Sequence, residues 1–401
     1  MKKPRLFIAM HYLEIGGAEA ALIGLLHALD PEKVEVDLFL HAHRGEMLGL
    51  VPEWVNLLPE IPAYAAIEKP VKEIVRHGHL AVAAARWIAR KRVQRYQRRS
   101  SDGGYGAEFG YVAASVAPVL PSLRRFGRYD LAISFLAPHN YVLRHVDAAR
   151  KACWIHTDYS RVGIDSELEM PVWNGYDSIV SISPAVTETF CSRFPGLRYK
   201  ILEIGNISPV GHIRESAMSG RPSDMPSRPG RMQLLTVGRF AGVKRMHLIP
   251  ALCRRLVERR LDVEWFLIGY GGDENLIRRN IDKEGMRDRV HILGKKENPY
   301  PYIAACDCYV QPSTFEGNSV TVREAQILGR PVVITDYPTA GSQVRDGVDG
   351  VIVPMHPDEC AEGLARVLSS PETLAKLSEN AMAGDYSNAG EVEKIYKLAG
   401  L

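Results

Sequence analysis

The sequence has 401 residues, which is too long for one hydrophobic core, so we expect two or three domains. Hydrophobic residues make up 46% and charged residues 24%, as in an ordinary soluble globular protein. The net charge of +3 gives no argument for nucleic-acid binding.

Targeting and redox signals are weak. The six cysteines contain no C-x-x-C pair, and a reading as buried free thiols in a reducing compartment is favoured over a metal site. The basic start is followed by too short an apolar run for a signal peptide, and no run of about 18 apolar residues follows. We therefore expect a cytoplasmic protein without a membrane span.

Short strand-like runs alternate with amphipathic helical stretches along the first half of the chain. A helix is expected over 16–29, and Ser183 with Pro184 forms a helix cap and first helical residue for another. The expected strands are 5–10, 34–40, 130–135, 151–156, 177–182 and 199–204. This alternation predicts a parallel sheet with right-handed crossovers.

One helical stretch, 71–99, departs from this alternation. Its last part, Arg86–Arg99, has seven basic residues in fourteen positions and no acid, interleaved with Trp87, Ile88, Val93 and Tyr96. Arginines and interfacial aromatics together are typical of helices that lie on an anionic membrane surface. A plain solvated face and a nucleic-acid contact are the alternatives, the last without any supporting motif.

The alternation restarts after a stretch rich in Pro, Gly and Ser, about 208–230, which resembles a linker. The expected strands of the second half are 232–238, 263–269, 289–294, 308–312, 331–336 and 350–354. We predict two Rossmann-like α/β domains, 1–207 and 231–385. The final helical segment, about 386–401, is expected to pack back on the first domain.

Charged residues near two strand ends of the second half suggest a site for a diphosphate. Arg239 and Lys244 follow the strand at 232–238, and a helix beginning near Asn318–Ser319 follows the strand at 308–312. Ligands of open parallel sheets bind at such strand ends, where a helix N-terminus favours phosphate. Gly317 allows a close backbone approach.

Two glutamates flank this helix start. Glu324, further along the helix, could accept hydrogen bonds from ribose hydroxyls, as acids do in dinucleotide sites. The alternatives without a binding function are that Glu316 is an ordinary loop acid and that Glu324 is an exposed helix acid. Taken singly each signal is weak, and their order and spacing strengthen the combination.

Several motifs resemble the successive signatures of glycosyltransferase family 4. They are "VGRFAGVKR", "LIGYGG", "PSTFEGNSVTVREAQILGRPVVITD" and "DGVDGVIVP", with "GGAEAALIGLL", "WIHTDY", "ISPAV" and "IGNI" in the first half. The likeness covers nearly the whole chain and is strongest over 232–354. It implies a GT-B fold, two Rossmann-like domains facing each other across a cleft. The first would bind acceptor and the second nucleotide-sugar donor.

The resemblance also implies roles for individual residues. Arg239 and Lys244 match the basic pair that contacts the donor diphosphate and stabilises the leaving group. Glu316 matches the acid that faces the donor sugar, and Glu324 the acid that holds the ribose. The remaining implied donor contacts are Gly317, Asn318 and Ser319 by backbone amides, Gly16 and Gly17 at the diphosphate, Gly294 beside the base, and His156 at the sugar.

Some positions differ from the family pattern. "GNS" follows the first acid in place of glycine-phenylalanine-proline, which makes the donor-sugar preference less readable. A structural histidine at a strand end is the alternative for His156. No D-x-D motif is present, so a site without metal or other cofactor is expected, with cations stabilising the leaving phosphate.

The resulting hypothesis is a retaining, metal-independent hexosyltransferase. It would move a sugar from a nucleotide-diphosphate sugar, UDP favoured over GDP, to a glycan or lipid-linked acceptor in surface polysaccharide or glycolipid synthesis. The enzyme would be cytoplasmic, and it could contact the inner face of the membrane through Arg86–Arg99. A sugar-nucleotide epimerase and a non-catalytic nucleotide-sugar-binding scaffold of the same fold are the alternatives.

Overall fold

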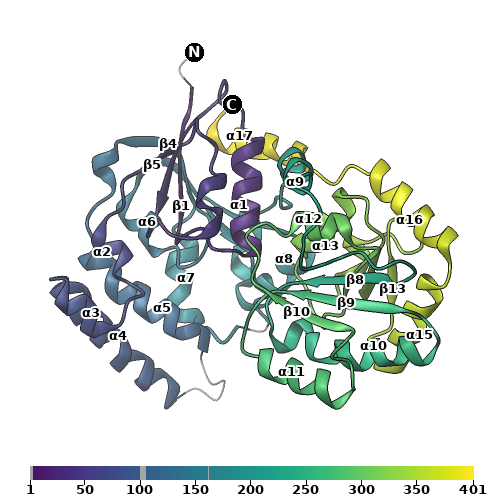
Figure 1. The fold of residues 1–401 in the computed structure, drawn as a ribbon. Coiled ribbons are helices and arrows are strands. Elements are labelled where there is room, and N and C mark those ends of the chain that lie inside the picture. The colour runs from purple at the N-terminus through teal and green to yellow at the C-terminus, as the bar shows by residue number, and fades with distance from the viewer. Residues whose placement is uncertain (1–2, 100–104, 161) are drawn as a thin grey trace. The chain divides into compact units, whose positions relative to one another are not determined.

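A computed structural model describes residues 3–99, 105–160 and 162–401. The chain folds as two compact units, each built on one parallel sheet (Figure 1). The first unit contains 1–207 together with 389–401, and the second contains 208–388.

The first unit holds a seven-stranded parallel sheet in the order β3-β2-β1-β4-β5-β6-β7. Its strands are β1 Arg5–Met10, β2 Glu35–Leu40, β3 Asn56–Leu57, β4 Arg128–Ser134, β5 Asp147–Ile155, β6 Ser178–Ser181 and β7 Ile201–Glu203. The six expected strands are therefore confirmed, while β3 is an addition. The strand order reverses between β1 and β4, so the loops after these strands diverge there.

The helices of the first unit are α1 Gly17–Ala28, α2 Pro62–Ala65, α3 Val71–Arg76, α4 Leu80–Gln97, α5 Tyr105–Val116, α6 Asn140–His145, α7 Ser166–Asn174, α8 Pro184–Arg193 and α17 Val392–Ala399. The Ser183 hydroxyl accepts a hydrogen bond from the Val186 amide, which confirms the expected cap. The continuous helix expected over 71–99 is wrong: Gly78, at φ 80°, separates α3 from α4.

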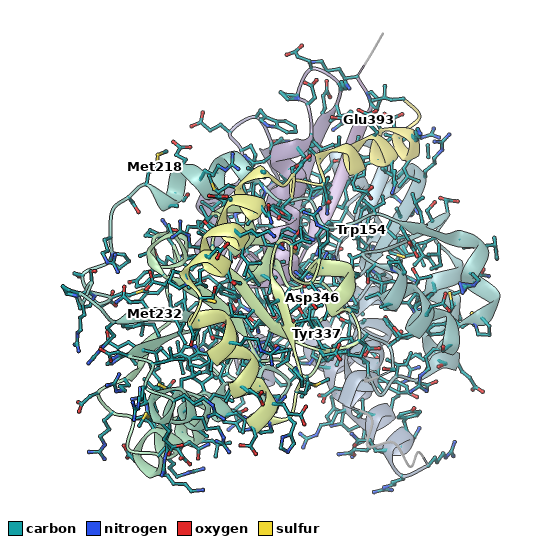
Figure 2. All side chains as sticks on the ribbon, turned by 90° about the vertical axis from the view of Figure 1, so that its right-hand side faces the viewer. Trp154, Met218, Met232, Tyr337, Asp346 and Glu393 are labelled. Atoms are coloured by element: carbon teal, nitrogen blue, oxygen red, sulfur yellow. The ribbon has the colours of Figure 1, made fainter. Side chains whose placement is uncertain are left out.

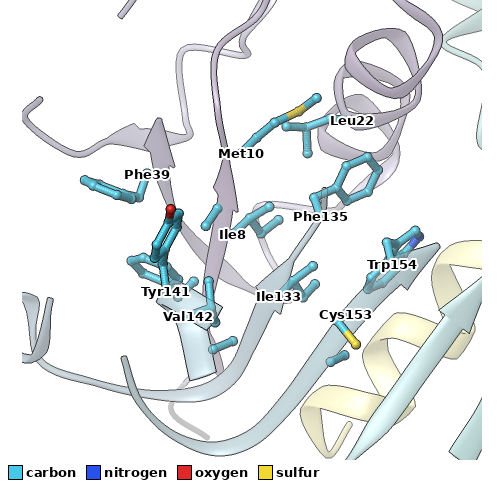
Figure 3. Close-up of a cluster of buried hydrophobic side chains, with 14 of the residues drawn as sticks. Ile8, Met10, Leu22, Phe39, Ile133, Phe135, Tyr141, Val142, Cys153 and Trp154 are labelled. Carbon is cyan, nitrogen blue, oxygen red and sulfur yellow. The ribbon is translucent and has the colours of Figure 1, made fainter. Parts of the chain in front are cut away.

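The core of the first unit lies between the sheet and its helices. Figure 3 shows Leu22 of α1 and Val142 of α6 with the strand residues Ile8 and Ile133, all fully or almost fully buried. Such runs of aliphatic residues are expected in strands covered on both faces.

Helix α17 belongs to the first unit, as expected. The Tyr396 hydroxyl accepts a hydrogen bond from the Asp30 amide at 2.8 Å, and Ile395 is buried in the same core. The chain therefore returns to the first sheet after completing the second unit.

The second unit holds a six-stranded parallel sheet in the order β10-β9-β8-β11-β12-β13. The strands are β8 Met232–Val237, β9 Val263–Ile268, β10 Val290–Gly294, β11 Cys308–Gln311, β12 Val332–Thr335 and β13 Val351–Val353. The helices are α9 Val210–Ala217, α10 Ile249–Glu258, α11 Glu274–Lys283, α12 Tyr300–Ala305, α13 Val320–Ile327, α14 Ala340–Gln343, α15 Pro357–Leu368 and α16 Pro371–Ala383. All six expected strands are present.

The linker expected over 208–230 is wrong, because this segment is an integral part of the second unit. It contains α9, and both Ile213 and Met225 are buried in the core with Phe266. Met218, just after α9, instead projects outward and is 77% exposed (Figure 2). The Pro, Gly and Ser residues of the segment form its turns. Their abundance made the sequence look like a linker, although the segment also contains buried apolar residues.

Two further expectations concern cysteines and membrane spans. All six cysteines are free and buried, as expected. Across residues 3–99, 105–160 and 162–401, no helix combines the length and the apolar character needed to cross a bilayer.

Candidate active site

The predicted site residues of the second unit gather where the strand order of its sheet reverses. Strands β8 and β11 are neighbours, and the chain leaves them toward opposite sides, through loops 238–245 and 312–319. Ligands of open α/β sheets bind at this topological switch point, outside the carboxyl ends of the strands. Arg239 and Lys244 lie in the first loop, and Glu316 and Gly317 lie in the second.

Lys244 and Glu316 form a direct ion pair across these two loops. The Lys244 Nζ atom lies 2.7 Å from Oε1 and 2.9 Å from Oε2 of Glu316. The Glu316 residue is only 8% exposed, whereas the lysine side chain is 20% exposed. An ammonium group has three protons, so two contacts with the carboxylate leave one for an oxygen of a ligand.

Two neutral side chains fix the same carboxylate. The Ser313 hydroxyl donates to Glu316 Oε1 at 2.5 Å, and the Gln311 amide donates to it at 3.2 Å. The two loops are also joined through their backbones, since the Thr314 amide donates to the Val243 carbonyl at 2.8 Å. A buried charge held by several hydrogen bonds keeps one orientation.

Arg239 occupies an exposed place at the beginning of the first loop. Glycines determine how this loop packs: a Cβ atom on Gly269, at φ 147°, would stand 1.9 Å from the Gly238 carbonyl oxygen. A Cβ atom on Gly271 would similarly lie 2.4 Å from the Phe240 oxygen. The "LIGYGG" motif therefore allows the backbone after β9 to support the loop that carries Arg239 and Lys244.

The second loop ends in helix α13, whose N-cap is Ser319, as the sequence predicts. The Ser319 amide already donates to Gln343 Oε1 at 3.1 Å, and the Gln343 amide group donates to the Ser319 carbonyl. Gly317 and Asn318 are partly exposed. A ligand phosphate at this helix start would therefore meet the amides of 317 and 318 more readily than that of Ser319.

Glu324, just over one turn into α13, is buried rather than solvent-facing, with 6% exposure. The Tyr300 hydroxyl donates to its Oε1 at 3.1 Å. Burial raises the pKa of the Glu324 carboxyl to about 7, and the tyrosine hydrogen bond opposes this shift. Such a carboxylate gains from any further hydroxyl donor, which is the chemistry that a ribose diol would offer.

Gly294 ends β10 with φ 72°, a conformation that favours glycine. Its carbonyl accepts a hydrogen bond from the Gly269 amide at 2.9 Å, and a Cβ atom added at 294 would meet no atom within 4 Å. The position is thus open on its side-chain side, next to the glycine-supported loops.

In the part of the chain that the structure describes, no group of three or more His, Cys, Asp or Glu side chains is arranged to hold a metal ion. The positive groups at the switch point include Arg239, Lys244 and the start of α13. They are suited to a phosphate group.

The match to a family model identifies this domain. The model for glycosyl transferases group 1 matches residues 223–383. These residues are a group 1 glycosyl transferase domain. The alignments with curated relatives cover only part of this chain. Alpha-D-kanosaminyltransferase from Streptomyces kanamyceticus is 27% identical over 47% of this chain, which spans about half (52%) of that protein's length.

Two other comparisons extend beyond the group 1 domain. The lipopolysaccharide core biosynthesis glycosyltransferase LpsE from Rhizobium meliloti is 26% identical, over 60% of this chain and 68% of that protein. The crystal structure of Anabaena HepE in complex with UDP and glucose matches with a TM-score of 0.68 at 17% identity, covering 99% of this chain and 100% of HepE. At this identity the match shows the fold, which is GT-B.

Three predicted residues lie outside the group 1 domain, in the first unit. His156 follows β5, with its ring centroid 4.8 Å from that of Phe135, and among the described residues nothing bonds its buried Nε2 atom. Burial lowers the pKa of His156 to about 4, so the imidazole is neutral. A neutral ring with one free nitrogen suits a hydroxyl contact, and its role at the sugar stays a prediction.

Gly16 and Gly17 lie at the start of α1, after β1. The Gly16 backbone is extended, at φ −166°, and therefore accessible to any residue. The nearest atoms to an added Cβ atom belong to the Glu19 carboxylate, with Oε2 at 2.2 Å, and this flexible side chain can move aside. Contact of this turn with a diphosphate stays a prediction.

Several residues of the group 1 domain site could not be predicted from the sequence. Tyr300 binds Glu324, while Ser313, Gln311 and Gln343 hold the loop and helix start around Glu316. Ser313 and Gln311 have a weak signal, since both lie within five residues of Glu316. Tyr300 and Gln343 have none, because their contacts depend on how α12 and α14 pack against α13.

Proposed function

We propose that this protein is a retaining glycosyltransferase. It would move a sugar from a nucleotide-diphosphate sugar to a glycan or lipid-linked acceptor in surface polysaccharide or glycolipid synthesis. The observation that carries the proposal is the Lys244–Glu316 pair at the switch point of a group 1 domain, at 2.7 Å. It puts a cation and a fixed carboxylate beside the start of α13, where a sugar diphosphate needs both.

Each residue then has a distinct part in donor binding. Arg239 and Lys244 would neutralise the diphosphate, and the 317–318 amides would bind a phosphate or sugar oxygen. Glu316, held by Ser313 and Lys244, would accept a hydrogen bond from a sugar hydroxyl. Glu324 would accept from the ribose. UDP is the favoured nucleotide, which is supported by the relative HepE, solved with UDP and glucose.

The reaction breaks the bond between the anomeric carbon and the β-phosphate oxygen and forms one from the acceptor oxygen to that carbon. Negative charge grows on the leaving phosphate, so Arg239 and Lys244 stabilise the transition state more than the ground state. Attack on the same face retains configuration, and the leaving phosphate oxygen takes the acceptor proton. No carboxylate then needs to act as a nucleophile.

Helix α4 supports a site of action at the cytoplasmic face of a membrane. Its buried face consists of small and branched residues, while Trp87 is 61% and Ile88 49% exposed. Of the seven basic residues, Arg86 donates to the Ile67 and Lys69 carbonyls and Arg92 packs on Tyr111, so both face the protein. The five exposed ones are Arg90, Lys91, Arg95, Arg98 and Arg99.

A panel of nucleotide sugars tests the donor part, followed by a transfer assay. UDP and at least one UDP-sugar should raise the melting temperature of the full chain, because a ligand that binds the folded state stabilises it. The labelled sugar should then appear on lipid-linked or soluble glycan acceptors. Donor conversion without an acceptor would instead indicate an epimerase, and binding without any turnover a scaffold. No shift and no transfer would contradict the proposal.

A further inference from the structure

A cavity of about 420 Å³ lies within the first unit at the carboxyl ends of β1 and β2. It is flanked by the loop that precedes α6 and by helices α2 and α5. This volume is within the range of small-ligand sites, and the place beside the β1–β4 strand reversal is where open sheets bind ligands. None of the donor roles proposed above uses its lining residues.

The inner wall of the cavity is aromatic and uncharged. The Tyr64 and Tyr141 rings lie 6.0 Å apart at right angles, and the His41 ring lies 5.6 Å and 5.3 Å from them. The His11 ring stacks on that of His41 at 4.9 Å. Burial lowers the pKa of His11 to about 4 and lowers that of His41 as well, so both imidazoles are neutral near pH 7.

The outer wall carries charges that balance. Arg44 lies 3.1 Å from Glu68 Oε2, and His11 Nδ1 lies 3.6 Å from Glu68 Oε1. Arg86 and Glu108 also line the cavity, so two cations face two acids. The Glu68 side chain is 45% exposed, and its position allows it to accept a hydrogen bond from a ligand.

The backbone that carries Arg44 is rigidly placed. A Cβ atom on the neighbouring Gly45, at φ 111°, would lie 2.1 Å from the Leu13 carbonyl carbon and oxygen. The Leu13 amide also donates to the Arg44 carbonyl at 3.0 Å. The loops after β1 and β2 are thus locked together at the rim of the cavity, which preorganises Arg44 and, through it, Glu68.

We propose that this cavity binds an uncharged sugar residue of the acceptor, with Glu68 accepting hydrogen bonds from its hydroxyl groups and Phe109 covering its apolar face. Phe109 lines the cavity on α5 and is 70% exposed, so its ring is free to pack against a ligand. A phosphate or a uronic acid would require an excess of positive charge. An alkyl chain would desolvate Arg44 and Glu68 without replacing their hydrogen bonds. The proposal rests on the proposed function.

The test uses the full chain and three methyl glycosides: glucoside, N-acetylglucosaminide and glucuronide. Saturation-transfer NMR should show binding of a neutral glycoside and weaker or no binding of the glucuronide. Glu68→Gln should weaken binding of the neutral glycoside about tenfold, since one charge-assisted hydrogen bond is lost. Phe109→Ala is a second variant. Because Phe109 is exposed, this change tests the cavity even if Glu68→Gln destabilises the fold.

Two controls locate the effect. Glu53→Gln, an exposed glutamate of the same unit, removes the same charge away from the cavity and should leave glycoside binding unchanged. Glu316→Gln tests whether the glycoside binds at the donor-sugar position instead. The inference would be overturned if this variant weakened binding of the neutral glycosides while Glu68→Gln and Phe109→Ala did not. Absence of binding by any neutral glycoside would overturn it too.

The outcome is separable from that of the proposed function. One outcome is that glycoside binding depends on Glu68 while the protein neither binds UDP nor transfers sugar. This would support the inference about the cavity and contradict the proposed transferase function. Transfer to a glycan acceptor whose KM is unchanged by Glu68→Gln and Phe109→Ala would do the reverse. In the supported case the acceptor KM rises about tenfold in both variants, while the melting shift produced by UDP reports on intact donor binding.

Discussion

The Lys244 ammonium lies 2.7 Å and 2.9 Å from the two oxygens of the Glu316 carboxylate, and this pair joins the loops that follow β8 and β11. The lysine therefore has two tasks. It neutralises a carboxylate that is only 8% exposed, and it supplies positive charge where the proposed leaving phosphate would lie. The two tasks can be separated by mutation.

Lys244→Ala is expected to lower sugar transfer by about 100-fold or more, because the leaving phosphate loses a fixed cation. It should also destabilise the protein by roughly 2 kcal/mol, since Glu316 is left buried without its partner. Adding Glu316→Gln to it should recover much of the stability without recovering transfer. Lys283→Ala, at an exposed lysine of α11, is the matched control. Full activity in Lys244→Ala would rule out the proposed role.

Glu324 should make the stability of the protein depend on pH. Burial raises the pKa of this carboxyl from its ordinary value of 4.5 to about 7, so the folded state favours the protonated form. The cost of ionising it is absent below pH 4.5, develops between 4.5 and 7, and is complete above 7. At about 1.36 kcal/mol per pH unit, the full cost is roughly 3 kcal/mol.

Glu324→Gln should therefore raise the free energy of unfolding at pH 8 by up to about 3 kcal/mol and change it little at pH 4.5. Urea unfolding at both pH values measures this difference. The same variant should weaken UDP binding, because a neutral amide accepts ribose hydroxyls less strongly. Glu379→Gln, at an exposed glutamate of α16, should do neither. Equal stabilisation at both pH values would show that charge burial is not the cause.

Two methionines of the segment 208–230 differ sharply in burial. Met225 is fully buried in the core of the second unit, whereas Met218 is 77% exposed (Figure 2). Met225→Ala should lower the free energy of unfolding by about 2–5 kcal/mol, while Met218→Ala should stay within about 0.5 kcal/mol of the wild type. A flexible linker would give the same small effect for both, and urea unfolding distinguishes the two cases.

The sequence was sufficient to predict the positions of residues that follow a strand end or begin a helix, and insufficient for contacts across the fold. The loop after β8, the helix start at Ser319 and the two acids could be predicted because strand ends and caps have local signals. The pairing of Lys244 with Glu316 could not, since 72 residues separate them and their contact depends on β8 lying beside β11. Tyr300 was missed for the same reason.

The basic surface of α4 gives the last prediction. Arg90, Lys91 and Arg95 are exposed beside Trp87 and Ile88, so the full chain should bind vesicles that contain phosphatidylglycerol more tightly than neutral phosphatidylcholine vesicles. Each basic residue near an anionic surface contributes about 1 kcal/mol. Replacing these three by glutamine should then weaken binding roughly 100-fold in vesicle sedimentation.

A charge-matched control separates a docking face from general attraction of a basic protein. Arg278, Arg279 and Lys283 of α11 are also exposed, and their replacement by glutamine removes the same charge from the second unit. We expect this triple variant to bind anionic vesicles as the wild type does. Trp87→Ala should weaken binding even at high salt, because its contribution is apolar and not screened. Equal loss in both triple variants would identify α4 as a solvated helix face.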